Sequence, residues 1–299
     1  MRVIQTIADL RAALPASQPV CLVPTMGNLH PGHLSLIRVA REHLERDSGQ
    51  VAADGGRVAA ERGGLVVASI FVNPLQFAPH EDFAKYPRTL ERDRALLDAA
   101  GCDIVFAPEP REIYPDAQEF KVQPPAALAE ILEGGVRPGF FPGVCTVVLK
   151  LFNIVRPNAA VFGKKDYQQL LVVSNMVRPF NLPVEIIAGE TVRETSGLAL
   201  SSRNGYLNDQ QHTEAAQLRA ALLMAASAAR AGNTDWAQIE QASFDFLAKR
   251  GWQPDYVAIR KRSDLAVPPS SPPDATTNSL VVLAAARLGG TRLIDNLEF

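Results

Sequence analysis

The chain has 299 residues, more than one hydrophobic core usually serves, so its length predicts one large domain or two unequal ones. Lys and Arg total 30 against 32 Asp and Glu, and this balance excludes a chain whose overall positive charge draws it to nucleic acid or to an anionic membrane. A hydrophobic content of 47% with 21% charged residues excludes a disordered chain and predicts a buried core.

Short apolar runs followed by turns recur through the first 190 residues and are typical of buried strands in a parallel sheet. The expected strands are residues 20–23, 65–72, 104–107, 159–162 and 184–188. Apolar residues at helical spacing occupy the segments between them and predict helices over residues 34–44, 90–100, 144–155 and 167–177. This alternation predicts an α/β fold with a doubly wound parallel sheet.

The pattern changes after about residue 190. Two long Ala-rich segments, 213–231 and 234–249, are expected to be helices, and they precede expected strands at 256–259, 280–286 and 292–294. We therefore expect a second, smaller α+β C-terminal domain, with domains 1–191 and 192–299. Residues 47–64 and 268–278 lack apolar periodicity and are expected to be solvated loops, the first an insertion between a helix and its next strand.

The three cysteines, Cys21, Cys102 and Cys145, are far apart and form no Cys-x-x-Cys pair. This usage suits a reducing compartment and argues against a disulfide framework or a structural zinc site. No run of about 18 apolar residues occurs, and the first residues lack the apolar core of a signal peptide. We expect a cytoplasmic protein that binds neither membrane nor nucleic acid.

The first candidate site follows the strand expected at 20–23, where a Gly- and Pro-containing turn leads into a helix. Its residues are Met26, Gly27, Asn28, Leu29, His30, Pro31, Gly32 and His33. Ligands bind at the carboxyl ends of strands in open parallel sheets, and free backbone amides at a helix start attract phosphate. The alternatives are turn glycines beside surface histidines, or a metal site, for which no further ligands lie at local spacing.

The second candidate site repeats this strand–turn–helix pattern and comprises Gly163, Lys164, Lys165 and Asp166, with Gln168 and Gln169 following. Lysines at a strand's carboxyl end place positive charge where a triphosphate would lie, although Asp166 could simply cap the helix.

Two further segments carry polar residues that in isolation could be turns or linkers. One contains Asn73 and Gln76 after the strand expected at 65–72. The other contains Val192, Arg193, Leu200, Ser201, Ser202 and Arg203. Hydroxyls beside a guanidinium can donate to phosphate oxygens.

Taken together and in this order, the motifs resemble the pantothenate synthetase (pantoate–β-alanine ligase) family over nearly the whole chain. They include His30-Pro31-Gly32-His33, Asn73-Pro74-Leu75-Gln76, Tyr86-Pro87-Arg88-Thr89, Leu132-Glu133-Gly134-Gly135, Gly163-Lys164-Lys165-Asp166, Ser201-Ser202-Arg203-Asn204 and Arg292-Leu293-Ile294-Asp295-Asn296. That family belongs to the nucleotidyltransferases with a His-x-Gly-His signature. The resemblance implies a Rossmann-like first domain, a small second domain acting as a lid, and a homodimer. It also implies that ATP and (R)-pantoate form pantoyl adenylate and pyrophosphate, and that β-alanine then displaces AMP, with Mg²⁺ required.

The resemblance also implies roles for single residues. The ATP site would comprise Met26 to His33, Gly163 to Asp166, Val192, and Leu200 to Arg203. The catalytic residues would be His30, His33, Lys165, Ser202 and Arg203. Gln76 and Gln169 would bind pantoate, with Gln76 beside the β-alanine site and Asn73 nearby, and Asp93 matches a position associated with magnesium.

The chain departs from the family pattern at three positions of these motifs, one of which is Leu200, where Met is common. Pro31 stands where Glu is common, and Lys164 stands where Glu is common, which makes Lys165 the expected catalytic lysine. Lys164, Lys165, Arg193 and Arg203 are expected to converge with both histidines on one triphosphate. The alternatives are another adenylate-forming enzyme of the superfamily, or a nucleotide-binding protein without turnover.

Overall fold

The computed structural model describes residues 1–47, 63–77, 83, 86–270 and 279–299, and the chain divides into two compact units. The N-terminal unit comprises Met1–Pro124, Gly139–Lys164 and Val172–Glu190. The C-terminal unit comprises Thr191–Phe299 together with two earlier segments, Pro125–Pro138 and Lys165–Leu171. The domain boundary after residue 191 stays a prediction. The expected loops lie largely outside the described residues, at 48–62 and 271–278.

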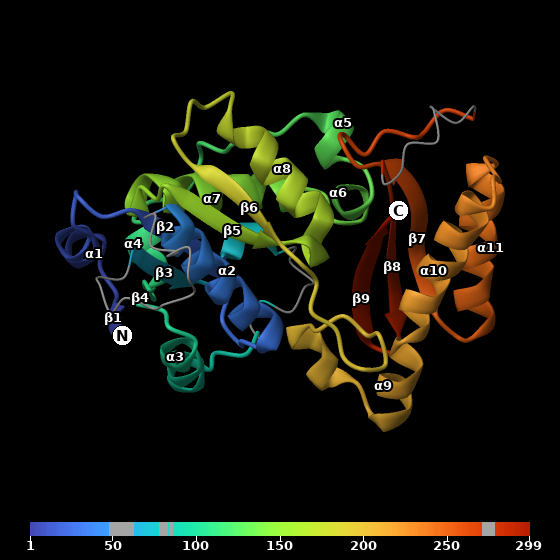
Figure 1. Ribbon diagram of the computed structural model, residues 1–299, viewed down its shortest axis with the longest axis horizontal. Helices are drawn as coiled ribbons and strands as arrows, with labels where there is room; N and C mark the ends of the chain where they lie inside the picture. The colour runs from blue at the N-terminus through green and yellow to red at the C-terminus, as the bar shows by residue number, and fades with distance from the viewer. Residues whose placement is uncertain (48–62, 78–82, 84–85, 271–278) are drawn as a thin grey trace, which may run out of the picture. The chain divides into compact units, whose positions relative to one another are not determined.

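A six-stranded parallel sheet forms the centre of the N-terminal unit, in the order β1-β4-β3-β2-β5-β6 (Figure 1). Its strands are β1 (Arg2–Ile4), β2 (Val20–Thr25), β3 (Leu65–Ile70), β4 (Ile104–Phe106), β5 (Ala159–Gly163) and β6 (Glu185–Gly189). The parallel, doubly wound sheet predicted from the sequence is confirmed. The short edge strand β1 was not predicted, because three residues are too few to show a period.

The strand order contains a switch point between β2 and β5. From β2 the chain proceeds to β3 and β4 on one side, and it returns to β5 and β6 on the other side. Open parallel sheets bind ligands outside the carboxyl ends of the strands at such a point. The topology therefore marks the ends of β2 and β5 as the place for a site.

Helices cover both faces of this sheet. They are α1 (Ile7–Ala13), α2 (Pro31–Asp47), α3 (Leu90–Ala99), α4 (Pro110–Ile113) and α7 (Phe140–Val155), while α8 (Tyr167–Val177) runs from one unit into the other. In Figure 1, α2 lies across the sheet, where its buried Ile37 and Ala40 pack with Cys21 and Val23 of β2. The ring of Phe152 on α7 packs edge-on against Phe162 of β5.

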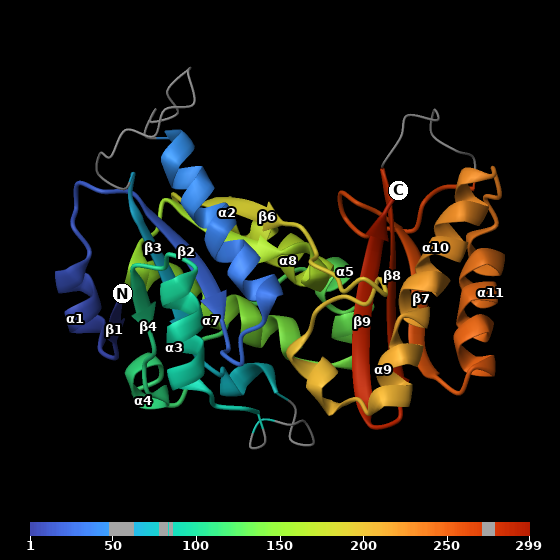
Figure 2. The ribbon, with the colours of Figure 1, turned by 60° about the horizontal axis from the view of Figure 1, so that its bottom comes forward.

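The C-terminal unit has a three-stranded antiparallel sheet, β7 (Gln253–Lys261), β8 (Leu280–Leu288) and β9 (Thr291–Glu298), with α9 (Asp209–Ala215), α10 (Gln217–Arg230) and α11 (Trp236–Lys249) (Figure 2). The single helix expected over residues 213–231 is wrong, because the structure divides this stretch at Ala216. The sequence carries no sign of the break, since alanine is the strongest helix former. The first helix also begins earlier, where Asn208 and Gln211 form a capping box.

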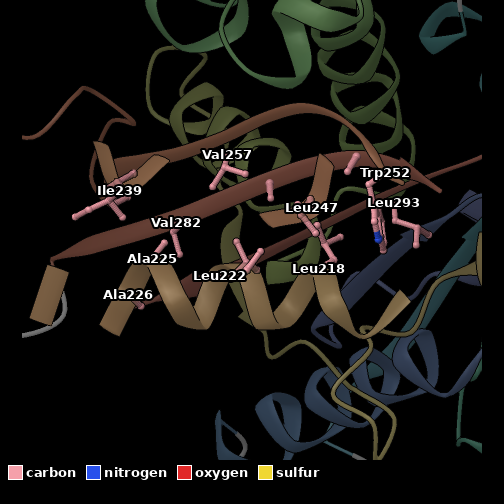
Figure 3. Packing of buried hydrophobic residues seen from close by; sticks show 14 of the residues in the cluster. Leu218, Leu222, Ala225, Ala226, Ile239, Leu247, Trp252, Val257, Val282 and Leu293 are labelled. Atoms are coloured by element: carbon pink, nitrogen blue, oxygen red, sulfur yellow. The ribbon is translucent and has the colours of Figure 1, made fainter. Parts of the chain in front are cut away.

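Alternate residues of β8 face α10 and form the core of the C-terminal unit (Figure 3). Val282 and Ala284 pack with the fully buried Leu218 and Leu222 of α10, and α11 adds Leu247. The small alanines of α10 leave room for the helix to approach the sheet closely between these larger side chains. Among the described residues, no helix is both long enough and apolar enough to cross a membrane.

Short helical turns complete the two units and hold several motif residues. They are η1 (Pro74–Gln76), α5 (Ala126–Ala129), α6 (Glu133–Val136), η3 (Lys164–Asp166) and η4 (Ser202–Tyr206).

Candidate functional site

Polar motif residues follow three neighbouring strands of the N-terminal unit, and the carboxylate of Glu190 follows the next strand. Asn73 and Gln76 come after β3, the segment from Met26 to His33 comes after β2, Lys164 follows β5, and Glu190 follows β6. The strands lie in the order β3-β2-β5-β6 and are parallel, so their carboxyl ends share one edge of the sheet. The motifs therefore surround the switch point.

The loop after β2 has a left-handed backbone and is held from α3. Gly27 and Asn28 have φ of 82° and 51°, a region that favours Gly and that Asn tolerates. A Cβ on Gly27 would lie 3.1 Å from Oδ2 of Asp93. The carboxylate of Asp93 is fully buried and accepts hydrogen bonds from the backbone N–H of Asn28 (2.8 Å), the N–H of Leu29 (2.9 Å) and the Thr89 hydroxyl (3.0 Å).

These contacts do not fit the magnesium ligand that the family resemblance implies for Asp93. Both of its oxygens are occupied by neutral donors, and a cation would have to displace them. Within the described ranges, no group of three His, Cys, Asp or Glu side chains lies together. The sequence predicts free amides for phosphate at the start of α2, but there the N–H of Gly32 donates to Nδ1 of His30, and the N–H groups of Asn28 and Leu29 before the helix donate to Asp93.

The two histidines at the start of α2 lie against each other, with ring centroids 4.0 Å apart. Pro31 is the first helical residue, where its missing N–H costs nothing. Nδ1 of His30 accepts from the N–H of Gly32 (3.1 Å), and Nδ1 of His33 accepts from the N–H of His30 (3.3 Å). A neutral imidazole that accepts at Nδ1 carries its proton at Nε2, and such an N–H group is the kind of donor that bonds phosphate oxygens.

The turn after β3 connects two of the motifs. Asn73 is buried, and its Nδ2 donates to Oε1 of Gln76 at 3.1 Å. Nε2 of Gln76 in turn lies 3.1 Å from the sulfur of Met26. The structure thus brings the polar turn after β3 beside the loop after β2.

The charged residues after β5 differ in their contacts. The Lys164 ammonium, in place of the family's common Glu, pairs with the exposed carboxylate of Glu190 at 2.5 Å. Asp166 is exposed. The backbone carbonyl of Lys165 accepts from Nδ2 of Asn296 at 3.0 Å within the C-terminal unit, which fixes the turn from which the Lys165 side chain extends.

The adjacent glutamines of α8 also differ. Gln168 is buried and fully bonded, since its amide donates to the carbonyls of Leu128 and Ile131 and accepts from the N–H of Glu133. Gln168 is therefore a structural residue that holds the segment before α6. Gln169 is half-buried on the same helix.

The carboxylate of Glu133, which the sequence left without a role, anchors this segment to the C-terminal sheet. It accepts two hydrogen bonds from Arg292, at 2.7 and 2.9 Å, and a third from the Tyr256 hydroxyl at 2.9 Å. Burial raises the pKa of Tyr256 well above its ordinary value, with the Glu133 charge adding to the effect. Only the family motifs around Glu133 and Arg292 could have drawn attention to these residues, and they do not reveal the pairing.

The motif from Val192 to Arg203 reverses the direction of the chain at the start of the C-terminal segment Thr191–Phe299. The N–H of Leu200 donates to the carbonyl of Val192 at 3.0 Å, so these two expected ATP contacts lie together. Ser201 caps η4 by accepting from the N–H of Arg203 at 3.2 Å, and Ser202 begins that turn.

Arg193 does not have the role expected from the sequence. Its guanidinium makes two parallel hydrogen bonds with Asp295, at 2.7 and 2.8 Å, and also donates to the carbonyl of Gly197. A guanidinium bonded in this way is a structural clamp and not a triphosphate ligand. Convergence of Lys165, Arg203 and the histidines on one triphosphate stays a prediction.

Comparisons with known proteins agree with one another. A family model described as pantoate-beta-alanine ligase matches residues 2–48 and 56–298. A pantothenate synthetase of Leptothrix cholodnii is 56% identical over 302 residues, and the match covers 100% of both chains.

Solved structures give the same result. A crystal structure of pantothenate synthetase from Thermus thermophilus matches with a TM-score of 0.86 and 45% identity, covering 100% of this chain and 99% of that one. A crystal structure of a pantoate-beta-alanine ligase from Francisella tularensis, complexed with beta-gamma ATP and beta-alanine, matches with a TM-score of 0.74 and 31% identity, covering 100% and 97%.

Proposed function

Because this chain belongs to the pantoate–β-alanine ligase family, whose reaction is the ATP-dependent condensation of pantoate with β-alanine, we propose that its motifs around the β2–β5 switch point carry out that reaction. The observation that carries this assignment of residues is the arrangement of three polar motifs at the carboxyl ends of three adjacent parallel strands, β3, β2 and β5. Ligand sites in open α/β sheets occur at this position.

In the first step, a carboxylate oxygen of pantoate attacks the α-phosphorus of ATP, and pyrophosphate leaves. Negative charge grows on the phosphate oxygens during this displacement. Lys165 and Arg203 supply positive charge, and the hydroxyl of Ser202 and the Nε2–H groups of His30 and His33 donate hydrogen bonds. Catalysis is then electrostatic stabilisation and positioning, with no covalent bond to the protein.

The remaining ATP contacts are the backbone and side chains of the loop and turns that carry these groups. They comprise Met26, Gly27, Asn28, Leu29, Pro31, Gly32, Gly163, Lys164, Asp166, Val192, Leu200 and Ser201. Because Lys164 is paired with Glu190, its contribution is at the rim of the site.

In the second step, the amine of β-alanine attacks the acyl carbon of pantoyl adenylate, loses a proton, and AMP leaves. Gln76 and Gln169 bind pantoate, and Asn73 supports Gln76 through their mutual hydrogen bond. Neutral amides suit this substrate, because they bond its hydroxyls and carboxylate without a full charge that would weaken the nucleophile. Movement of the C-terminal domain as a lid protects the labile adenylate from water.

Mg²⁺ accompanies ATP in this proposal and has no assigned ligand in the chain. Proteins usually hold Mg²⁺ through substrate phosphates, waters and one or two carboxylates. Asp93 does not fit that role, because its oxygens hold the loop after β2. The ion's chemistry is to offset charge on the phosphates.

The enzyme is proposed to be a cytoplasmic homodimer. A reducing compartment suits its three buried free thiols. Sedimentation equilibrium of the purified protein tests the oligomeric state, and a monomer at micromolar concentration would contradict the dimer.

Pyrophosphate release tests the proposed site directly. With ATP and pantoate alone we expect release limited to about one equivalent of enzyme, and with β-alanine added we expect continuous release. His33→Ala and Lys165→Ala should each lower turnover about 100-fold or more, the scale for loss of a transition-state donor. Lys261→Ala, which removes an exposed lysine paired with Asp264, is the matched control and should retain wild-type turnover. Near wild-type rates in either site variant would contradict its assigned role.

A further inference from the structure

The Asn73 side chain is enclosed by four hydrogen bonds that determine its orientation. Its Oδ1 accepts from the backbone N–H of Leu75 (3.3 Å) and from the hydroxyl of Tyr114 (2.8 Å), and its Nδ2 donates to the carbonyl of Gly143 and to Oε1 of Gln76, both at 3.1 Å. A backbone N–H can only donate and a carbonyl can only accept, so these two groups leave a single assignment for the amide.

The orientation of the Asn73 amide also determines which end of the Gln76 amide is the oxygen and which is the nitrogen. Because Nδ2 of Asn73 occupies Oε1 of Gln76, the other end of that amide, Nε2, is the end directed at Met26. The thioether sulfur is a weak acceptor. A carboxylate or hydroxyl oxygen of a substrate would accept more strongly from the same N–H group, so the arrangement prepares Gln76 as a donor.

Tyr114 donates its hydroxyl hydrogen bond to Oδ1 of Asn73 from a distant part of the chain. It follows α4, 41 residues from Asn73, and its ring packs 6.0 Å from that of Phe71 with the ammonium of Lys150 4.9 Å above it. Burial raises the pKa of Tyr114 well above its ordinary value, so the hydroxyl keeps its proton and remains a donor at working pH.

The turn that carries Asn73 and Gln76 rests directly on the backbone of α7. A Cβ at Gly143 would lie 2.2 Å from the carbonyl oxygen of Leu75 and 2.9 Å from the nitrogen of Gln76. Only glycine permits that approach, and the turn therefore has a rigid support on one side. Tyr114 completes the support through the Asn73 side chain.

We propose that Tyr114 is a positioning residue which, through Asn73, holds Gln76 with its Nε2 group presented as a hydrogen-bond donor to an oxygen of pantoate. The inference rests on the proposed role of Gln76 in binding pantoate and adds the residue that orients it. Tyr114 itself touches no substrate in this arrangement.

Steady-state kinetics of Tyr114→Phe test the proposal. This variant keeps the ring and removes the hydroxyl, and we expect KM for pantoate to rise about three- to tenfold, the equivalent of one neutral hydrogen bond, with KM for ATP unchanged. Adding Tyr114→Phe to Asn73→Ala should raise the pantoate KM no further, because the coupling runs through Asn73. Thr146→Val is the matched control: it removes a buried hydroxyl from α7 that bonds Pro142 and Val122 and not Asn73.

The outcomes separate this inference from the proposed function. If Gln76→Ala raises the pantoate KM and Tyr114→Phe does not, the positioning role is wrong while the substrate role of Gln76 stands. If Gln76→Ala leaves that KM unchanged, the proposed role of Gln76 fails first. A rise in pantoate KM in Thr146→Val equal to that in Tyr114→Phe would show general destabilisation, and it would overturn the inference.

Discussion

Replacement of Asp93 by Asn distinguishes a loop clamp from a metal ligand. The carboxylate accepts from the N–H groups of Asn28 and Leu29 with different oxygens, but an amide of the same size has one accepting atom. Its NH₂ group must face one of the two buried N–H donors. Losing one charge-assisted hydrogen bond and leaving a buried donor unsatisfied should lower the free energy of unfolding by about 2–4 kcal/mol.

Two measurements check this expectation on the same protein. Urea unfolding reports the loss of stability, and Mg²⁺ titration of pyrophosphate release reports the ion requirement. The Mg²⁺ concentration that gives half the maximal rate should stay within about twofold of wild type, because the clamp holds no ion. Asp98→Asn is the control on the same helix: its carboxylate is 63% exposed and pairs with the N-terminal amine, so its removal should change stability by less than about 1 kcal/mol.

The clamp would be refuted in either of two ways. Unfolding of Asp93→Asn within about 0.5 kcal/mol of wild type would show that its hydrogen bonds do not hold the loop. A tenfold or greater rise in the Mg²⁺ requirement, with stability retained, would show that Asp93 binds the ion.

Four further expectations follow from burial and pairing. Lys164→Ala should change kcat/KM for ATP less than about threefold in the same pyrophosphate assay, because its ammonium is paired with the exposed carboxylate of Glu190 at the rim of the site, and a loss near that of Lys165→Ala would contradict this. Burial raises the pKa of Cys21 and Cys145 to about 12 and that of Cys102 to about 11, so intact-mass analysis should find no alkylation by iodoacetamide at pH 8 in the native protein and three additions in denaturant. Since the unfolded thiols ionise first, near their ordinary pKa of 9.0, urea unfolding should also become easier as pH rises above that value. Leu222→Ala should cost about 2–5 kcal/mol by urea unfolding of the C-terminal unit, because this side chain is fully buried, and a cost below about 1 kcal/mol would contradict the packing.

The parallel sheet could be predicted because its central strands are largely buried on both faces and read as continuous apolar runs. The runs at Val20 and Ala159 each lead into a turn and a helix, and the structure has β2 and β5 there. The division of one expected helix at Ala216 could not be predicted, because alanine-rich sequence favours helix on both sides of the break.

The candidate site could be predicted only where it is local. The loop from Gly27 to His33 is one strand–turn–helix unit, so its residue types identify it. Hydrogen bonds between residues that are far apart in the sequence could not be predicted. Asp93 bonds the loop after β2 from 65 residues away, and Arg193 bonds Asp295 from 102 residues away. From the sequence alone, Arg193 is grouped with the nearby serines and is expected to bind phosphate. Its carboxylate partner, Asp295, lies too far along the chain for the sequence to reveal the pairing.

The contacts that hold the motifs also determine how phosphate can be recognised. Because the amides of Asn28 and Leu29 are bonded to Asp93, donors from side chains must supply more of the binding than in a site built from free amides. The direction of those donors depends on neutral backbone contacts: Nδ1 of His33 accepts an N–H, and the carbonyl of Lys165 is held by Asn296. Loss of such a holding contact should slow the reaction while every charged group of the site remains, because preorganised donors stabilise the transition state only when correctly placed.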